Sequence, residues 1–161
     1  MEYNKTNLSR TENPELLEYY EKVAQVNRVS KKTAGGGKQS LSVLVVVGDR
    51  KGKVGVGLGK ASDVRSAVAK ATIYAKKHMI EVPLRGKTIP HQIFLKRGAA
   101  KIILKPASEG RGIIAGGAVR QVVEAAGISD IVAKILGTKN QASNVYATLE
   151  ALKQLKTFQK K

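Results

Sequence analysis

Two glycine-rich segments of this 161-residue chain have residue types that can bind phosphate. In Lys53–Lys60 three glycines precede a lysine, but the P-loop spacing GxxxxGK followed by Ser or Thr is missing. A dinucleotide fingerprint, GxGxxG, would open a helix, whereas Gly55, Gly57 and Gly59 recur at every second residue, which is the period of a strand. We therefore expect a strand with one bare face, on which either the following helix packs closely or an RNA backbone approaches the lysines at the two ends.

The second glycine-rich segment, residues 106–117, leads directly into a predicted helix. Free N–H groups at a helix start attract anions, and Arg111 adds a positive charge beside them. We expect phosphate contacts at Arg111, Gly112, Gly116 and Gly117, and an ordinary flexible connection is the alternative.

The chain has few residues that are suited to catalysis or to metal binding. The chain has no cysteine, which excludes a disulfide scaffold, a thiolate metal site and a cysteine nucleophile. Its two histidines, His78 and His91, lie apart, and the seven carboxylates after residue 22 form no pair close in sequence for acid–base hydrolysis. We expect no catalytic residue, no metal, no cofactor and no small-molecule substrate.

The charge of the chain indicates a polyanionic partner. The formal net charge is +17, whereas solubility alone needs a net charge of about 2 to 8 in a small domain. Residues 23–60 are the densest part, with eight basic and one acidic side chain. No run of 18 apolar residues occurs and the longest helical pattern is rich in alanine, so we expect a nucleic acid and no membrane.

The small aromatic content restricts how a nucleic acid could be bound. Aromatic residues make up 4% of the chain and none lies in residues 23–60, so stacking of bases on a sheet is not expected there. The remaining mode is contact with phosphates and with the shape of folded RNA. The residues expected to make such contacts are Arg28, Ser30, Lys31, Lys32, Lys38, Arg50, Lys51, Lys53 and Lys60.

The elements that position these residues follow from periodicity and from turn residues. The first half is predicted to contain a short helix or turn from residue 16, a strand to residue 29 with Val23 and Val26 on opposite faces, a mobile glycine-rich loop at 31–38, strands at 40–48 and 53–60 around a turn, and a helix at 62–78. Ala61, Val64, Val68, Ala71 and Ala75 would form the apolar stripe of that helix.

A joint at residues 82–86 separates the second half, which is also predicted to alternate strands and helices. Strands are expected at 88–95, 100–105 and 130–136, with a basic turn at 96–98, an irregular loop at 107–116, and helices at 117–126 and 140–155. Val119, Val122, Val123 and Ala126 should face inward from the first of these helices.

Four stretches, taken together, have a familiar order and spacing: residues 26–31, VNRVSK; 46–49, VVGD; 54–61, VGVGLGKA; and 106–117, PASEGRGIIAGG. Over residues 15–156 the chain resembles the bacterial-type ribosomal protein S5 family of the small subunit. The resemblance implies an α+β fold with a double-stranded-RNA-binding-like β-β-β-α domain at 15–82, and an S5 domain-two-like α/β domain with a left-handed crossover at 83–157. A mobile tail at 1–14 and a basic tail at 158–161 would flank them.

The same resemblance implies a function and partners. Members of the family bind 16S rRNA where the body of the small subunit meets the head, lie beside ribosomal proteins S4 and S8 near the point where mRNA enters, and influence decoding accuracy. The expected compartment is the cytoplasm. The hairpin carrying His91, Lys96, Arg97 and Lys101 would face S4.

Two alternatives of other classes remain at this point. The superfamily of the second domain includes metabolite kinases that hold ATP phosphates on a glycine-rich loop, and residues 110–117 are similar in kind. The chain could instead act as a free RNA chaperone that loosens duplexes.

Overall fold

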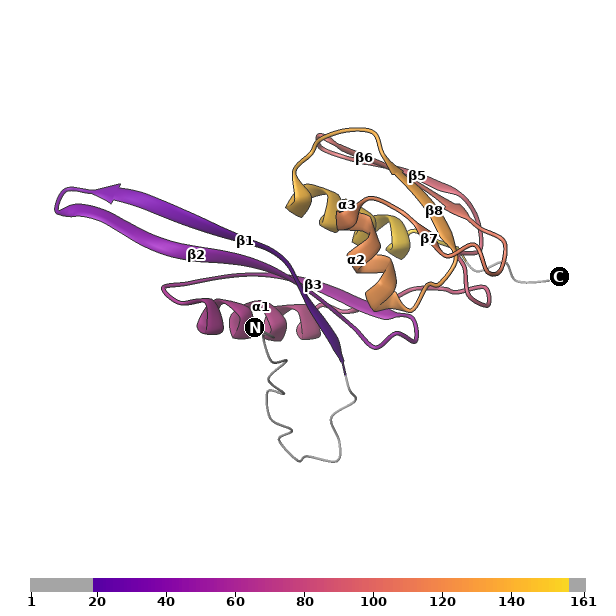
Figure 1. Cartoon of the computed structure of the whole chain (residues 1–161), viewed down its shortest axis with the longest axis horizontal. Coiled ribbons are helices and arrows are strands. Elements are labelled where there is room, and N and C mark those ends of the chain that lie inside the picture. The colour runs from indigo at the N-terminus through magenta and orange to yellow at the C-terminus, as the bar shows by residue number, and fades with distance from the viewer. Residues whose placement is uncertain (1–18, 157–161) are drawn as a thin grey trace, which may run out of the picture.

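The computed structural model describes residues 19–156, which form two four-stranded sheets and three helices (Figure 1). The expectations for residues 1–18 and 157–161, which include both tails and the short helix or turn from residue 16, lie outside the described residues. The first unit contains β1 (Tyr20–Thr33), β2 (Gly36–Gly48), β3 (Lys53–Ala61), α1 (Val64–Lys77) and β4 (Ile80–Glu81). The second unit contains β5 (Ile93–Arg97), β6 (Ala100–Pro106), β7 (Ile113–Ile114), α2 (Gly117–Ala126), β8 (Ile131–Ile135) and α3 (Gln141–Lys153).

The two sheets differ in topology. The first has the order β1-β2-β3-β4 with all neighbours antiparallel, and the second has the order β5-β6-β8-β7 with a parallel β7–β8 pair. The parallel strands β7 and β8 are joined through α2, so the second unit contains a β-α-β crossover. The expected α+β class, with a β-β-β-α unit followed by an α/β unit, is confirmed.

The elements stack in four layers, with α1, the first sheet, the helix pair α2–α3 and the second sheet in succession (Figure 1). Side chains of a strand alternate between its two faces, so the valine run of β2 serves two cores. Val43, Val45 and Val47 pack against α1, while Leu44 and Val46 belong to a larger cluster with α2, α3 and the second sheet. The two units therefore share their main hydrophobic core.

The bare face of β3 is the contact surface of α1. A Cβ atom at Gly57 would lie 2.0 Å from the carbonyl oxygen of Ala71, so only glycine allows the helix to come this close. Of the two predicted uses of this face, close packing of the following helix is the one observed. The other two close pairs are Gly55 with the carbonyl oxygen of Ala75, at 2.3 Å, and Gly59 with that of Ala67, at 2.1 Å.

Helix α1 begins and ends close to the predicted positions. Asp63 is the N-cap, and its carboxylate accepts the Ser66 N–H at 2.8 Å, which lowers the pKa of Asp63. The predicted apolar stripe is partly wrong, because Val64 is 46% exposed and Ala67 is fully buried. The buried face of α1 is the one whose backbone carbonyls contact the β3 glycines. This contact depends on tertiary packing, so the apolar pattern of the helix alone does not reveal it.

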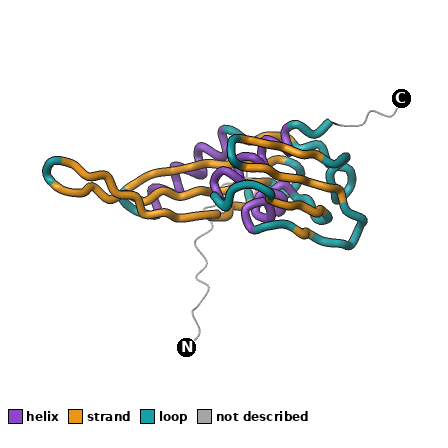
Figure 2. The backbone as a smooth tube through the Cα atoms, turned by 90° about the horizontal axis from the view of Figure 1, so that it is seen from above, coloured by secondary structure: helices purple, strands orange, loops and turns teal. Residues whose placement is uncertain are grey.

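The predicted mobile loop at residues 31–38 is wrong. Strands β1 and β2 continue through it, with Lys31 opposite Lys38, and only Ala34 and Gly35 lie between the two strands. Gly36 takes a positive φ of 125° next to this two-residue turn, so the glycine run serves a tight hairpin. Beyond the pair Leu41–Ala61 no third strand from residues 19–156 accompanies this hairpin. Residues 29–40, which we call the arm, project from the body of the molecule (Figures 1 and 2).

Strand β1 also departs from the predicted alternation. The pairing with β2 shifts between Val23 and Gln25, which leaves Ala24 as a bulge residue. Val23 and Val26 consequently pair with Val45 and Val43 and lie on the same face, contrary to the prediction.

Helix α2 has the predicted bounds and the predicted inner face, and Gly127 ends it in the left-handed conformation with φ 84°. The predicted start of the first strand in this half, at residue 88, is wrong by several residues, because β5 begins at Ile93. The turn that follows β5 lies at residues 98–99. Residues 88–92 are fixed by tertiary contacts instead, because Ile89 is fully buried and the backbone N–H of Lys156 donates to the ring of His91. The short strands β4 and β7 were not predicted.

Candidate nucleic-acid interface

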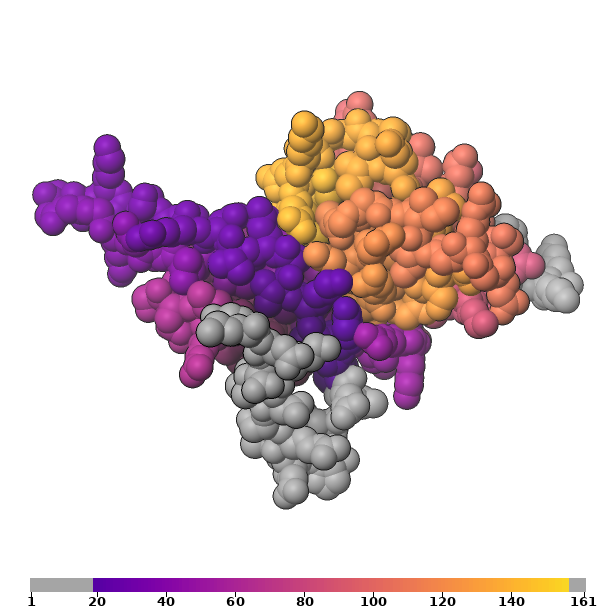
Figure 3. Space-filling model, in the orientation of Figure 1, coloured from indigo at the N-terminus to yellow at the C-terminus, as the bar shows by residue number. Residues whose placement is uncertain are grey.

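The arm is the most consistently basic part of the structure. No side chain between Lys22 and Gly48 is acidic, and the arm carries three exposed lysines, with Arg28 at its base. Figure 3 shows the arm standing clear of the rest of the molecule. The arm lysines are Lys31, Lys32 and Lys38.

The strand register distributes these charges over both faces of the arm. Lys31 and Lys38 are direct cross-strand partners and share one face, while Lys32 lies opposite Gly37 on the other. Like charges placed directly opposite each other destabilise a sheet. Within residues 19–156 none of the three ammonium groups has an ion pair, so an external anion would relieve the repulsion.

Arg28 is held at the base of the arm. Its Nε donates to Oε1 of Gln39 at 2.9 Å, and its Nη2 donates to the same oxygen. Ser30 is the cross-strand partner of Gln39, so Arg28 and Ser30 lie on the same face. The predicted contact residues of the arm are thus brought together, although along two faces and not as one clamp.

The basic residues of β3 lie at opposite ends of that strand. Lys60 pairs with Ser42 near the base of the arm, whereas Lys53 pairs with Glu81 at the far end. Both side chains are exposed. Lys60 therefore extends the basic surface of the arm, and Lys53 is remote from it.

The turn that carries Arg50 and Lys51 contacts the second unit. The guanidinium of Arg50 lies over the ring of Tyr20, 4.1 Å from its centroid, and its backbone N–H donates to the carbonyl of Ala125 at 3.0 Å. The last carbonyls of α2 are satisfied in this way. Arg50 is accordingly engaged within the chain, while the side chain of Lys51 is exposed.

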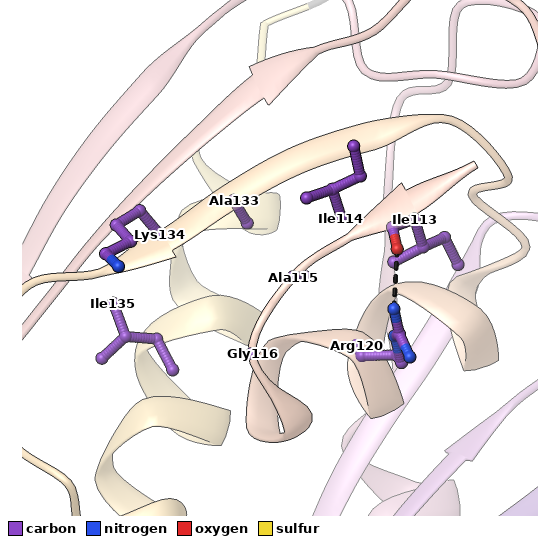
Figure 4. Close-up of a pocket in the computed structure, with 8 residues that line it drawn as sticks. All are labelled: Ile113, Ile114, Ala115, Gly116, Arg120, Ala133, Lys134 and Ile135. Atoms are coloured by element: carbon purple, nitrogen blue, oxygen red, sulfur yellow. Dashed lines mark hydrogen bonds between the residues drawn. The ribbon is translucent and has the colours of Figure 1, made fainter. Parts of the chain in front are cut away.

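The segment before α2 is more ordered than its composition indicated. The N–H of Gly112 donates to the buried carboxylate of Asp130 at 2.7 Å, so this group is already used. A hollow of about 450 Å³ lies between the segment and β8, and Arg120 at its rim donates to the carbonyl of Ile113 at 2.8 Å (Figure 4). Arg111 is exposed, and Gly116 caps α2 with no side chain.

The four predicted interface residues in and just before the β5–β6 hairpin fall into two pairs with different surroundings. Arg97 contacts α3, with its Nε 3.0 Å from a carboxylate oxygen of Glu150, and His91 receives the N–H of Lys156. Lys96 and Lys101 are exposed direct cross-strand partners. These two lysines are the members of the set that face outward without an internal ion pair among the described residues.

Comparison with known proteins assigns both halves of the chain. Residues 19–83 match the model for the N-terminal domain of ribosomal protein S5, and residues 95–161 match the model for its C-terminal domain. A relative named small ribosomal subunit protein uS5c, from Cyanophora paradoxa, is 49% identical over 156 residues, which cover 96% of this chain and 92% of the relative.

The chain belongs to the ribosomal protein S5 family. Members of the S5 family are structural components of the small ribosomal subunit and act in translation, and they are not enzymes. The kinase and chaperone alternatives are not favoured by this assignment. Within residues 19–156 no cluster of three or more potential metal ligands occurs, and no helix is long and apolar enough to cross a membrane.

Two residues of interest escaped the sequence-based prediction for this S5 chain. Lys139 and Asn144 line a second hollow at the start of α2, together with Gly117. An exposed lysine and a buried asparagine have no distinguishing sequence pattern, and only the packing of α2 against α3 brings them to the glycines.

Proposed function

We propose that the chain binds 16S rRNA through phosphates and helix shape, and that the arm is its main contact. The observation that carries this proposal is the projection of three lysines that have no ion pair among the described residues, two of them mutually repelling, on strands with no acidic side chain between Lys22 and Gly48. Neutralisation of phosphates by lysines supplies much of the affinity in such complexes.

The two-faced distribution of charge favours insertion of the arm between RNA segments. Lys31 and Lys38 would meet phosphates on one side, and Arg28 and Lys32 on the other. Lys60 at the base extends the contact. Arg111, Gly112, Gly116 and Gly117 would form a second contact on the other unit, with Lys51 and Lys53 at the periphery and Arg50 acting through its contact with α2.

The finer placement in the subunit is part of the same proposal. The chain would bridge the body and head near the point where mRNA enters and contribute to accuracy beside S4 and S8, with Lys96 and Lys101 facing a protein neighbour. We propose domain bounds of 15–82 and 83–157, and the cytoplasm as the compartment. The shared hydrophobic core supports such a bridge, because it fixes the two units relative to each other.

Shortening the arm tests the proposal on the whole subunit. Residues Lys31–Lys38 are replaced by Asn-Gly, which joins the cross-strand partners Ser30 and Gln39 by a turn suited to a hairpin. Sedimentation of reconstituted small subunits through increasing salt should release this variant at a lower salt concentration than the parent chain. Release of both chains at the same salt would contradict a main contact through the arm, and failure of the parent to sediment with the subunit would contradict the function itself.

A further inference from the structure

Two polar side chains of the second unit contact the first part of β1. A carboxylate oxygen of Glu124 in α2 lies 3.1 Å from the ammonium of Lys22. Two residues further along β1, the carbonyl of Ala24 accepts a side-chain N–H of Gln141, the first residue of α3, at 3.0 Å. Within residues 19–156 no later residue of β1 forms a hydrogen bond or an ion pair with the second unit. Gln141 therefore makes the last such contact before β1 continues into the arm.

The carbonyl that Gln141 binds belongs to the bulge of β1. Ala24 has no cross-strand partner, because the register with β2 shifts between Val23 and Gln25. A bulge bends its strand and increases the local twist, and β1 changes direction where it passes the helix pair (Figure 1). The direction in which the arm leaves the body therefore depends on the geometry of this bulge.

The two strands that enter the arm differ in their support. Strand β2 lies between β1 and β3 and contributes its valines to both cores, whereas β1 is an edge strand of the sheet. Beyond the pair Leu41–Ala61 only β1 and β2 remain paired with each other. A change at the bulge would therefore move β1 relative to a fixed β2 and alter the twist of the arm.

Gln141 lies between the base of the arm and the second proposed RNA contact. Its backbone is ordered by the cap of α3, where Asn140 accepts the N–H groups of Ala142 and Ser143. Its side chain is half-buried and also lines the hollow at the start of α2, together with Gly117. The contact with Ala24 consequently connects the arm to the part of the second unit that carries residues 111–117.

We propose that Gln141 is a positioning residue, which fixes the bulge of β1 and thereby the direction of the arm relative to the second unit. The inference rests on the proposed function, because the direction matters only if the arm and residues 111–117 bind the same RNA. Two linked contacts strengthen each other only when the geometry allows both at once. Loss of the hydrogen bond from Gln141 should therefore weaken RNA binding, although the proposed contact residues are all retained.

The first test measures the direction of the arm in the free full-length chain. The sequence has no cysteine, so spin labels attach only at Gly35→Cys, at the tip of the arm, and at Lys101→Cys, on exposed β6. Pulsed electron paramagnetic resonance should give a broader or shifted distance distribution in Gln141→Ala than in the labelled parent. Gln141→Glu has no N–H to donate and should behave like Gln141→Ala, whereas Gln141→Lys can donate and should restore the parent distribution. An unchanged distribution in Gln141→Ala would overturn the proposal.

The second test measures affinity for a 16S rRNA transcript. Gln141→Ala should lower the affinity about fivefold, because the arm then holds its binding direction for only part of the time. The salt slope should equal that of the parent, since no phosphate contact is removed. Gln154→Ala, at the other end of α3, is the matched control and should keep the parent affinity and slope.

The two measurements separate the proposal from the proposed function. A flatter salt slope in Gln141→Ala would mean that Gln141 itself contacts the RNA, and it would overturn the positioning role. Equal affinity of Gln141→Ala and the parent would overturn it as well, while the proposed function would stand. If the parent does not bind the transcript, the proposed function is wrong, and the distance distribution still decides whether Gln141 sets the direction of the arm.

Discussion

Replacement of Lys31, Lys32 and Lys38 by alanine should flatten the salt dependence of 16S rRNA binding by about two to three units in the slope of log K against log salt. The reason is counterion release, since each lysine that neutralises a phosphate contributes about one unit. The three side chains are exposed on the arm and make no internal ion pair in the described structure, so their loss should leave the fold intact. Binding to the transcript between low and moderate salt is the measurement.

A matched variant separates the arm from the total charge. Lys96, Lys101 and Lys105 are three exposed lysines on the β5–β6 hairpin, and their replacement removes the same charge. This control should keep most of the parent slope. An equal loss in both variants would mean that the affinity follows the net charge of the chain and not the position of the arm.

The largest effect on stability is expected at the β3–α1 contact. Gly57→Ala places a methyl group where the carbonyl oxygen of Ala71 lies 2.0 Å away, so α1 must move from the sheet. Overpacking of this kind costs about 1 to 3 kcal/mol and occasionally more, and a clash with helix backbone belongs at the upper end. The midpoint of urea unfolding should fall accordingly.

The control for this change is Gly37→Ala. Gly37 also lies in a strand, but a Cβ atom there meets nothing within 4 Å. Its midpoint of urea unfolding should equal that of the parent chain. If Gly57→Ala were as stable as Gly37→Ala, the close contact between β3 and α1 would not exist in solution.

Elements with a strong local signal were predictable from the sequence. Helix α2 was bounded correctly because a glycine pair precedes its apolar periodicity and Gly127 stops it. The turn at residues 49–52 and the start of α1 at Asp63 also depend on local turn and capping chemistry. In these segments the local preference and the tertiary structure agree.

Features that depend on distant contacts were not predictable. The arm has three consecutive glycines and a repelling lysine pair, so local patterning indicates a loop, whereas the register continues from the buried part of β1 and β2. Residues 88–92 were predicted as the start of a strand, but they lie before it and are fixed by the burial of Ile89. The bulge at Ala24 likewise shifts a register that alternation alone cannot reveal.

The sequence was enough to predict which segment carries the positive charge of the candidate site. It was not enough to predict how the charged side chains are arranged in space. The sequence indicated the excess of lysines in residues 23–60, but not that Lys31 and Lys38 lie opposite each other. Arg50 was predicted as an RNA contact, yet its guanidinium lies over Tyr20. Asn144 comes close to the start of α2 only because α2 packs against α3.

Cross-linking from the tip of the arm tests the central claim most directly. A photo-reactive amino acid in place of Gly35 stands in the exposed turn, where an added Cβ atom meets nothing within 4 Å. In assembled small subunits the probe should attach to 16S rRNA at a single region. Attachment only to ribosomal proteins, or no attachment in subunits that contain the chain, would contradict the claim that the arm binds 16S rRNA.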